Sequence, residues 1–262
     1  MTLNWQGDRF VITMTEKNNA LPILELDNLK VKVGGQEILH GIDCEVKQGE
    51  TYVLFGPNGS GKTSLVMAIM GAPAWKVTSG KIWFKGKDIT KVPMSERARR
   101  GIGMLFQRPP TVRGVTTRKM VEIASNRRAN PEALASRLQV TSLLDRDINH
   151  GFSGGEIKRT EILQLLAQQP AFIMFDEPES GVDLEHIVLI GQAMNELLGN
   201  ETDPQQKRSG LIITHTGHIL KYVPADRGYV LLDGKIICSG SPMKVLKQIE
   251  ENGYERCRKC EK

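Results

Sequence analysis

Aromatic residues and long apolar runs are both scarce in this sequence. Phe, Trp and Tyr make up 5% of the 262 residues, whereas glycine alone contributes 26. This balance favours an α/β protein with many turns over a β-sandwich. No apolar run approaches the ~20 residues that a membrane-spanning helix needs, and residues 1–20 carry charges in place of the apolar stretch of a secretory signal. We therefore expect a cytoplasmic protein of one or two domains, with no direct membrane insertion.

Aromatic residues are also scarce in the most basic segment. Eight arginines lie between Arg97 and Arg128, and Phe106 is the one aromatic residue among them. A nucleic-acid site would need interleaved aromatic side chains for base stacking, or a known binding module. The pattern instead favours a solvated or protein-docking surface, and no nucleic-acid partner is expected.

Cysteine is rare, with four residues in the chain. Cys44 and Cys238 fall in apolar, strand-like segments and are expected to be small buried residues. Cys257 and Cys260 form a CxxC pair, but two ligands cannot complete a tetrahedral zinc site. The role of this pair stays open.

The hydrophobic pattern separates a central region from two polar ends. Residues 1–20 lack helical or strand periodicity, so we expect a disordered extension, and translation from Met1 or from Met14 remains open. Residues 21–252 carry the ordered pattern, and residues 253–262 are expected to form a polar tail.

Within 21–252, two periodicities alternate. Leu24–Val33 and Ile38–Val46, joined by Gly34-Gly35, predict an antiparallel strand pair. Short apolar runs predict buried strands, which lie at Thr51–Phe55, Gly101–Gln107, Ala171–Phe175, Gly210–Thr214 and Gly228–Leu232. Between residues 111 and 150 the pattern becomes helical and charged, which predicts an inserted helical subdomain.

A glycine-rich motif follows the apolar run Thr51–Phe55. Phosphate oxygens need backbone N–H donors at close range, and glycines let the backbone come near enough. Lys62 is expected to reach the β- and γ-phosphates of ATP, and the Thr63 hydroxyl to ligate Mg²⁺. The residues predicted to bind the nucleotide here are Gly56, Pro57, Asn58, Gly59, Ser60, Gly61, Lys62, Thr63 and Ser64.

Two carboxylates follow the apolar run Ala171–Phe175. Such a pair at the carboxyl end of a buried parallel strand lies where α/β sheets bind ligands. We expect Asp176 to hold Mg²⁺ through water, and Glu177 to act as the general base that polarises the attacking water. The sequence therefore predicts MgATP hydrolysis by in-line water attack.

A second candidate phosphate cradle lies at Ser153–Glu156. Ser153 and Glu156 form a capping box, which predicts that a helix begins here. Gly154 and Gly155 in its first turn would each cost ~1 kcal/mol relative to alanine in a purely structural helix. They make sense where a phosphate approaches the helix N-terminus. Because one γ-phosphate does not need two cradles from one chain, we expect this one to serve the ATP of a second ATPase subunit.

The order of these motifs resembles the ABC ATPase superfamily over nearly the whole chain. The resemblance implies an α/β fold, a P-loop (RecA-like) core with an antiparallel β subdomain and a helical subdomain. Phe152–Glu156 matches the superfamily's LSGGQ-type motif, with Phe for Leu and Glu for Gln. Ser180–Asp183 matches the loop that crosses the dimer interface, so Asp183 is expected at the nucleotide.

The same resemblance assigns two further site residues. Gln107 matches the glutamine that links the active site to the helical subdomain and joins Thr63 and Asp176 at the metal. His215 matches the histidine that contacts the γ-phosphate, so the implied catalytic set is Glu177, His215, Lys62 and Gln107. Val33 stands where the superfamily usually has an aromatic residue that stacks on adenine, which leaves nucleotide specificity open.

A narrower resemblance is to the SufC subfamily, the ATPases of the Suf iron–sulfur cluster assembly system. It rests on Gly151–Gln164, Ser180–Asp183, Val33 and the ending Glu250–Tyr254. It implies a soluble SufB-like scaffold, with or without a SufD-like one, as the partner. Pro178, after Glu177, is common in transporter ATPases, so the alternative is the ATPase subunit of a membrane ABC transporter. Partner identity and stoichiometry stay open.

Overall fold

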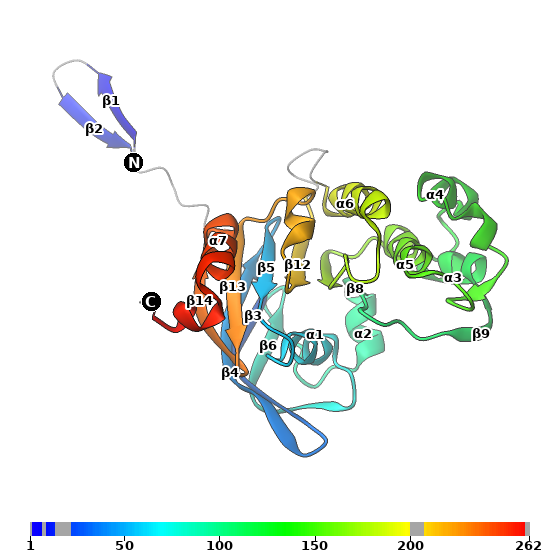
Figure 1. Ribbon diagram of the computed structural model, residues 1–262, viewed down its shortest axis with the longest axis horizontal. Coiled ribbons are helices and arrows are strands. Elements are labelled where there is room, and N and C mark those ends of the chain that lie inside the picture. Colours follow the sequence, from blue (N-terminus) through cyan, green and yellow to red (C-terminus); the bar gives the residue numbers. More distant parts are fainter. Residues whose placement is uncertain (1, 7–8, 14–21, 200–206, 260–262) are drawn as a thin grey trace.

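The computed structural model describes residues 2–6, 9–13, 22–199 and 207–259. Its centre is a six-stranded sheet in the order β14-β13-β5-β12-β11-β8 (Figure 1). The strands that run parallel are β5 (Thr51–Phe55), β8 (Ile102–Leu105), β11 (Phe172–Asp176), β12 (Ser209–Thr214) and β13 (Arg227–Leu232). β14 (Lys235–Gly240) pairs antiparallel with β13 at one edge. The α/β core predicted from the sequence is confirmed.

The central sheet is buried on both faces, as parallel sheets are. Every residue of β5 is buried, and its side chains alternate between two apolar clusters. Tyr52 and Leu54 belong to one cluster, with α1 (Lys62–Met70). Val53 and Phe55 belong to the other, with α5 (Gly154–Gln168), α6 (Leu184–Leu198) and α7 (Pro242–Asn252). Helices on both sides therefore hold the strand ends, where the predicted site residues lie.

A second, four-stranded antiparallel sheet lies beside α1. Its order is β4-β3-β6-β7, and its strands are β3 (Pro22–Val33), β4 (Gln36–Lys47), β6 (Trp75–Phe84) and β7 (Lys87–Asp88). The pairing of β3 with β4 is the one that the sequence predicts. Val33 of β3 lies opposite Trp75 of β6 in the register of the two strands.

Arg97 in α2 (Met94–Arg99) corrects one expectation. It belongs to the arginine-rich segment that the sequence indicates as a surface, yet it is buried. Its guanidinium donates to the Ala68 and Ile69 carbonyls at the C-terminal end of α1, at 2.9 Å and 2.7 Å. A planar guanidinium with five donors suits this end of a helix, where carbonyls lack helical partners.

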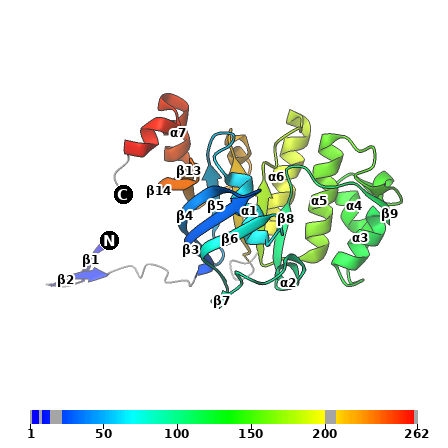
Figure 2. The same ribbon diagram turned by 90° about the horizontal axis from the view of Figure 1, so that it is seen from below.

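The region 111–150 contains α3 (Thr117–Ala124), α4 (Pro131–Arg137) and the 3₁₀ turn η1 (Thr141–Leu143). The two helices lie with α5 at one end of the molecule (Figure 2). The region is not wholly helical as expected, because β9 (Val112–Thr116) and β10 (Asp147–Ile148) pair antiparallel and join its two ends. The sequence did not predict these two strands, because they are short and their pairing partners lie far apart in the chain.

Both ends of the chain differ from the expectations. β1 (Thr2–Gln6) and β2 (Arg9–Thr13) form a separate hairpin that places Leu3 opposite Ile12 and Trp5 opposite Phe10, so residues 1–20 do contain an alternating pattern. Residues 14–21, with Met14, lie outside the described residues.

At the other end, η4 (Tyr254–Lys259) replaces the expected polar tail, and Cys257 is fully buried in the core cluster of α7. Cys260 lies outside the described residues. None of the helices that the structure describes is long and apolar enough to cross a membrane.

Candidate active site

The P-loop joins β5 to α1. Gly61 has a left-handed backbone with φ of 105°, and a Cβ there would lie 2.9 Å from Leu39 Cδ2, so only glycine fits. α1 begins at Lys62 without a side-chain cap, which leaves its first amides available. An uncapped helix start behind a glycine loop provides the donors and dipole that a phosphate needs.

Lys62 is buried within this loop. Its Nζ donates to the Gly56 carbonyl at 2.7 Å and to the Pro57 carbonyl at 2.9 Å. Burial lowers the pKa of Lys62, and the nearby carboxylates of Glu177 and Asp176 act in the opposite direction. The ammonium group therefore lies within the loop and near the acidic pair, and its contact with the β- and γ-phosphates stays a prediction.

Asp176 ends β11, and its side chain is the least satisfied group in the site. The residue is 1% exposed, and within the described part of the chain neither carboxylate oxygen has a well-formed hydrogen bond. Burial raises its pKa to about 6, and the Thr63 hydroxyl beside it works against that rise. A buried carboxylate without donors is costly unless a cation compensates it. Asp176 and Thr63 therefore fit the Mg²⁺ ion predicted for them.

Glu177 has a left-handed backbone, with φ of 49°. Gln107 Nε2 donates to Glu177 Oε2 at 2.6 Å, and His215 Nδ1 lies 3.0 Å from Glu177 Oε1. These three predicted residues come from the ends of β8, β11 and β12. The structure thus brings the proposed base and the two residues assigned by resemblance into one hydrogen-bonded group. In this arrangement the Gln107 amide is engaged with Glu177.

The predicted capping box is present at the start of α5. Ser153 N donates to Glu156 Oε2 at 2.7 Å, and Glu156 N donates to Ser153 Oγ at 3.4 Å. A Cβ on Gly154 would lie 2.3 Å from the Gly181 carbonyl oxygen, so the helix start touches the loop Ser180–Asp183 backbone to backbone. Asp183 caps α6, accepting from His186 N at 3.0 Å.

The predicted residues therefore form two groups. Among the residues described, neither Ser153–Glu156 nor Asp183 shares a hydrogen bond or ion pair with the P-loop or with Asp176 and Glu177. Gly154 and Gly155 begin a long helix in the second group, while the P-loop begins α1 in the first. Two separate glycine-rich helix starts are what a site shared between two subunits requires.

Three residues near the site were not predicted. The Tyr254 hydroxyl donates to the His215 carbonyl at 3.3 Å, a contact between distant segments that leaves no local signal. Lys158 and Glu161 contact the backbone that carries Gln107. The sequence did not mark this pair, because Arg159 and Thr160 between them are buried too and α5 has no separate apolar face.

The fold and the site together define a P-loop ATPase with a second glycine-rich helix start. The family model for the ABC transporter family matches residues 39–180. This chain belongs to that family, as one of its ABC ATPases. ABC ATPases bind ATP and ADP with Mg²⁺, hydrolyse ATP, form nucleotide-dependent dimers and pair with other subunits.

Individual relatives agree with this assignment. A probable ABC transporter ATP-binding protein of Streptococcus pyogenes serotype M3 is 36% identical over 248 residues, which cover 89% of this chain and 94% of that protein. The probable ATP-dependent transporter ycf16 of Cyanophora paradoxa is 35% identical, with 92% of this chain and 95% of that protein covered. The ADP conformation of MJ1267, an ATP-binding cassette of an ABC transporter, is 27% identical and has a TM-score of 0.71. That match covers 92% of this chain and 100% of the other.

Proposed function

We propose that this ABC ATPase is a cytoplasmic subunit that drives conformational change in a SufB-like or SufD-like scaffold during iron–sulfur cluster assembly. The observation that carries the proposal is the α5 region, Gly151–Gln164, whose sequence is similar to the SufC subfamily. Its charged residues Lys158, Arg159 and Glu161 are buried. The resemblance therefore includes residues that are buried beside the site.

The chemistry follows from the residues of this chain. Glu177 removes the proton of the attacking water, with Gln107 and His215 holding its two carboxylate oxygens. Lys62 and the P-loop amides stabilise the charge on the transferred phosphoryl group. Asp176 and Thr63 hold Mg²⁺, which supplies further neutralisation of that charge when bound. Ser153–Glu156 of a second subunit completes each site.

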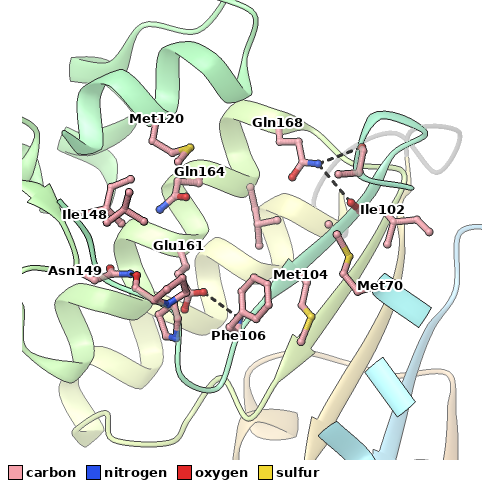
Figure 3. Close-up of a pocket in the computed structure, with 16 residues that line it drawn as sticks. Met70, Ile102, Met104, Phe106, Met120, Ile148, Asn149, Glu161, Gln164 and Gln168 are labelled. Carbon is pink, nitrogen blue, oxygen red and sulfur yellow. Dashed lines mark hydrogen bonds between the residues drawn. The ribbon is translucent and has the colours of Figure 1, made fainter. Parts of the chain in front are cut away.

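A candidate surface for the partner lies close to these residues. A pocket of about 240 Å³ lies among β8, α2, α3 and α5, and its apolar wall includes Met70, Met104, Phe106, Met120 and Ile148 (Figure 3). Methionine side chains adapt readily to an incoming segment. Because Phe106 directly precedes Gln107, a scaffold segment in this pocket would touch the neighbour of the residue whose side chain contacts the proposed base Glu177.

A second candidate is the ATPase subunit of a membrane ABC transporter. The relatives above are named as a probable ABC transporter ATP-binding protein and a probable ATP-dependent transporter, and Pro178 follows Glu177. A permease could use the same pocket, so the fold alone does not separate the two candidates. The identity of the partner distinguishes the two candidate functions.

The test is affinity purification of the tagged protein from its native cells, with and without detergent, followed by mass spectrometry. A soluble scaffold recovered without detergent, and lowered iron–sulfur enzyme activity after depletion, are expected. Met120→Arg should fill the pocket and abolish recovery, whereas Ile123→Arg, on the exposed side of the same helix, should not. If a polytopic membrane protein is the reproducible partner and iron–sulfur enzymes are unaffected, the transporter function replaces this proposal.

A further inference from the structure

A buried ion pair on α5 is not used by any step described so far. Lys158 Nζ and Glu161 Oε2 are 4.0 Å apart, and the two side chains are 3% and 6% exposed. Both residues lie one to two turns beyond the glycines of the second cradle, on the side of the helix that faces β8. The two charged groups are therefore buried, and both contact the backbone at the end of β8.

The pair binds both backbone polar groups of Phe106, which belong to two successive peptide units. Phe106 N donates to Glu161 Oε1 at 3.0 Å, as Figure 3 shows, and Lys158 Nζ donates to the Phe106 carbonyl. Lys158 Nζ also lies 3.4 Å from the Gln107 carbonyl. The backbone on either side of Gln107 is thus fixed by charged groups, which make stronger hydrogen bonds than neutral ones.

Gln107 transmits this restraint to the reaction centre. Its side-chain amide donates to Glu177 at 2.6 Å, so a rotation of the Phe106–Gln107 backbone would move the amide away from the carboxylate. We propose that Lys158 and Glu161, on α5, are positioning residues for ATP hydrolysis. They orient the Gln107 side chain toward Glu177. The inference concerns the ATPase reaction and holds for either partner.

The cost of this pair supports a role beyond packing. Burial lowers the pKa of Lys158 and raises the pKa of Glu161 to about 7. Within the described residues, Glu161 Oε2 is buried and has no hydrogen-bond partner. Replacing a buried ion pair by apolar residues is often neutral or stabilising, so a helix that served only to pack would not need these charges.

The pair also lies beside the partner pocket. Glu161 and Phe106 both line it, so a segment bound there would contact the residues that hold the Gln107 backbone. Lys158 additionally faces the negative charges of Asp176, Glu177 and Glu179. Loss of the Lys158 charge would therefore change the electrostatics of the catalytic carboxylates as well as the packing of α5.

The first test measures kcat and nucleotide affinity in the full-length protein. Lys158→Met/Glu161→Gln removes both charges but keeps an acceptor for Phe106 N–H. We expect kcat to fall about tenfold, with the Kd for nucleotide unchanged within about twofold, because only orientation at the reaction centre is lost. The control makes the same two replacements in the exposed pair Lys247 and Glu251, whose charged atoms are 3.8 Å apart on α7, and its kcat should not change.

A double-mutant cycle shows whether the pair acts through Gln107. In a Gln107→Ala background, Lys158→Met/Glu161→Gln should lower kcat by less than about twofold further, since the residue to be positioned is gone. A purely structural role predicts that the two effects multiply. Multiplying effects, an unchanged kcat in the first variant, or an equal loss of nucleotide affinity would overturn the proposal.

Single substitutions at Glu161 provide a second, independent comparison if the double variant does not fold. Glu161→Gln keeps the acceptor for Phe106 N–H and should retain most of the wild-type kcat. Glu161→Leu removes that acceptor and should lower kcat about tenfold while melting in a single cooperative transition. Equal kcat values for the two variants would show that the contact with Phe106 does not position Gln107.

Discussion

Replacing Asp176 by asparagine should stabilise the metal-free protein while it removes ATPase activity. The Asp176 carboxylate is 1% exposed, and in the described structure its oxygens have no well-formed hydrogen bond. Asparagine has nearly the same shape and cannot ionise, so the substitution removes the buried charge without opening a cavity. It also removes the carboxylate expected to hold Mg²⁺, and hydrolysis should fall by orders of magnitude.

The size of the stability change follows from the pKa of Asp176. Burial raises it from 3.8 to about 6, which corresponds to about 3 kcal/mol at pH values above both. The native state binds this proton more tightly than the unfolded state does, so stability is lost as the pH rises from 3.8 to about 6. The free energy of unfolding of Asp176→Asn should therefore exceed that of the wild type by up to about 3 kcal/mol at pH 8. The difference should shrink as the pH falls toward 4.

Urea unfolding in EDTA, without nucleotide and at several pH values, measures this difference. Asp183→Asn is the control of opposite sign, because the His186 amide lowers the pKa of the exposed Asp183, and the substitution removes a favourable negative charge from the N-terminus of α6. If Asp176→Asn were no more stable than the wild type at pH 8, burial of the Asp176 carboxylate would not destabilise the native state as described above. A gain that did not vary with pH would also contradict the reasoning, since it could not come from ionisation.

Four further predictions concern the site and the chain ends. Glu177→Gln should keep MgATP binding but lose hydrolysis by orders of magnitude and accumulate an ATP-dependent dimer, and near wild-type turnover would remove Glu177 from the role of base. The wild-type subunit without nucleotide should be monomeric by light scattering, because Ser153–Glu156 serves a second subunit; a stable dimer would contradict this. With Val33 in place of an aromatic residue worth ~1–3 kcal/mol of stacking, GTP should compete well with ATP, and a strong preference for ATP would direct attention to its strand partner Trp75. Deletion of Met1–Thr13 should leave ATPase activity and melting temperature unchanged, since β1 and β2 form their own sheet, and a fall of more than ~3 °C would show that the hairpin is docked.

The strands, the P-loop and the capping box could be predicted from the sequence because each depends on near neighbours. Alternation or an apolar run identifies a strand, and glycines followed by Lys62 and Thr63 identify a phosphate loop. α6 begins after Asp183, whose side chain caps it, and ends at Gly199, whose backbone is left-handed; both residue types are local start and stop signals. Resemblance to a family added Gln107 and His215, which are ordinary residues when considered alone.

The tertiary structure alone decided which of these residues meet. Gln107 and Glu177 are 70 positions apart, and His215 is 38 beyond Glu177, so their contact depends on the order of β8, β11 and β12 in the sheet. The same holds for Lys158 and Glu161, whose burial depends on the packing of α5 against β8. Local patterns report the conformation of a few consecutive residues, whereas burial and partnership depend on segments that are brought together only when the whole core forms.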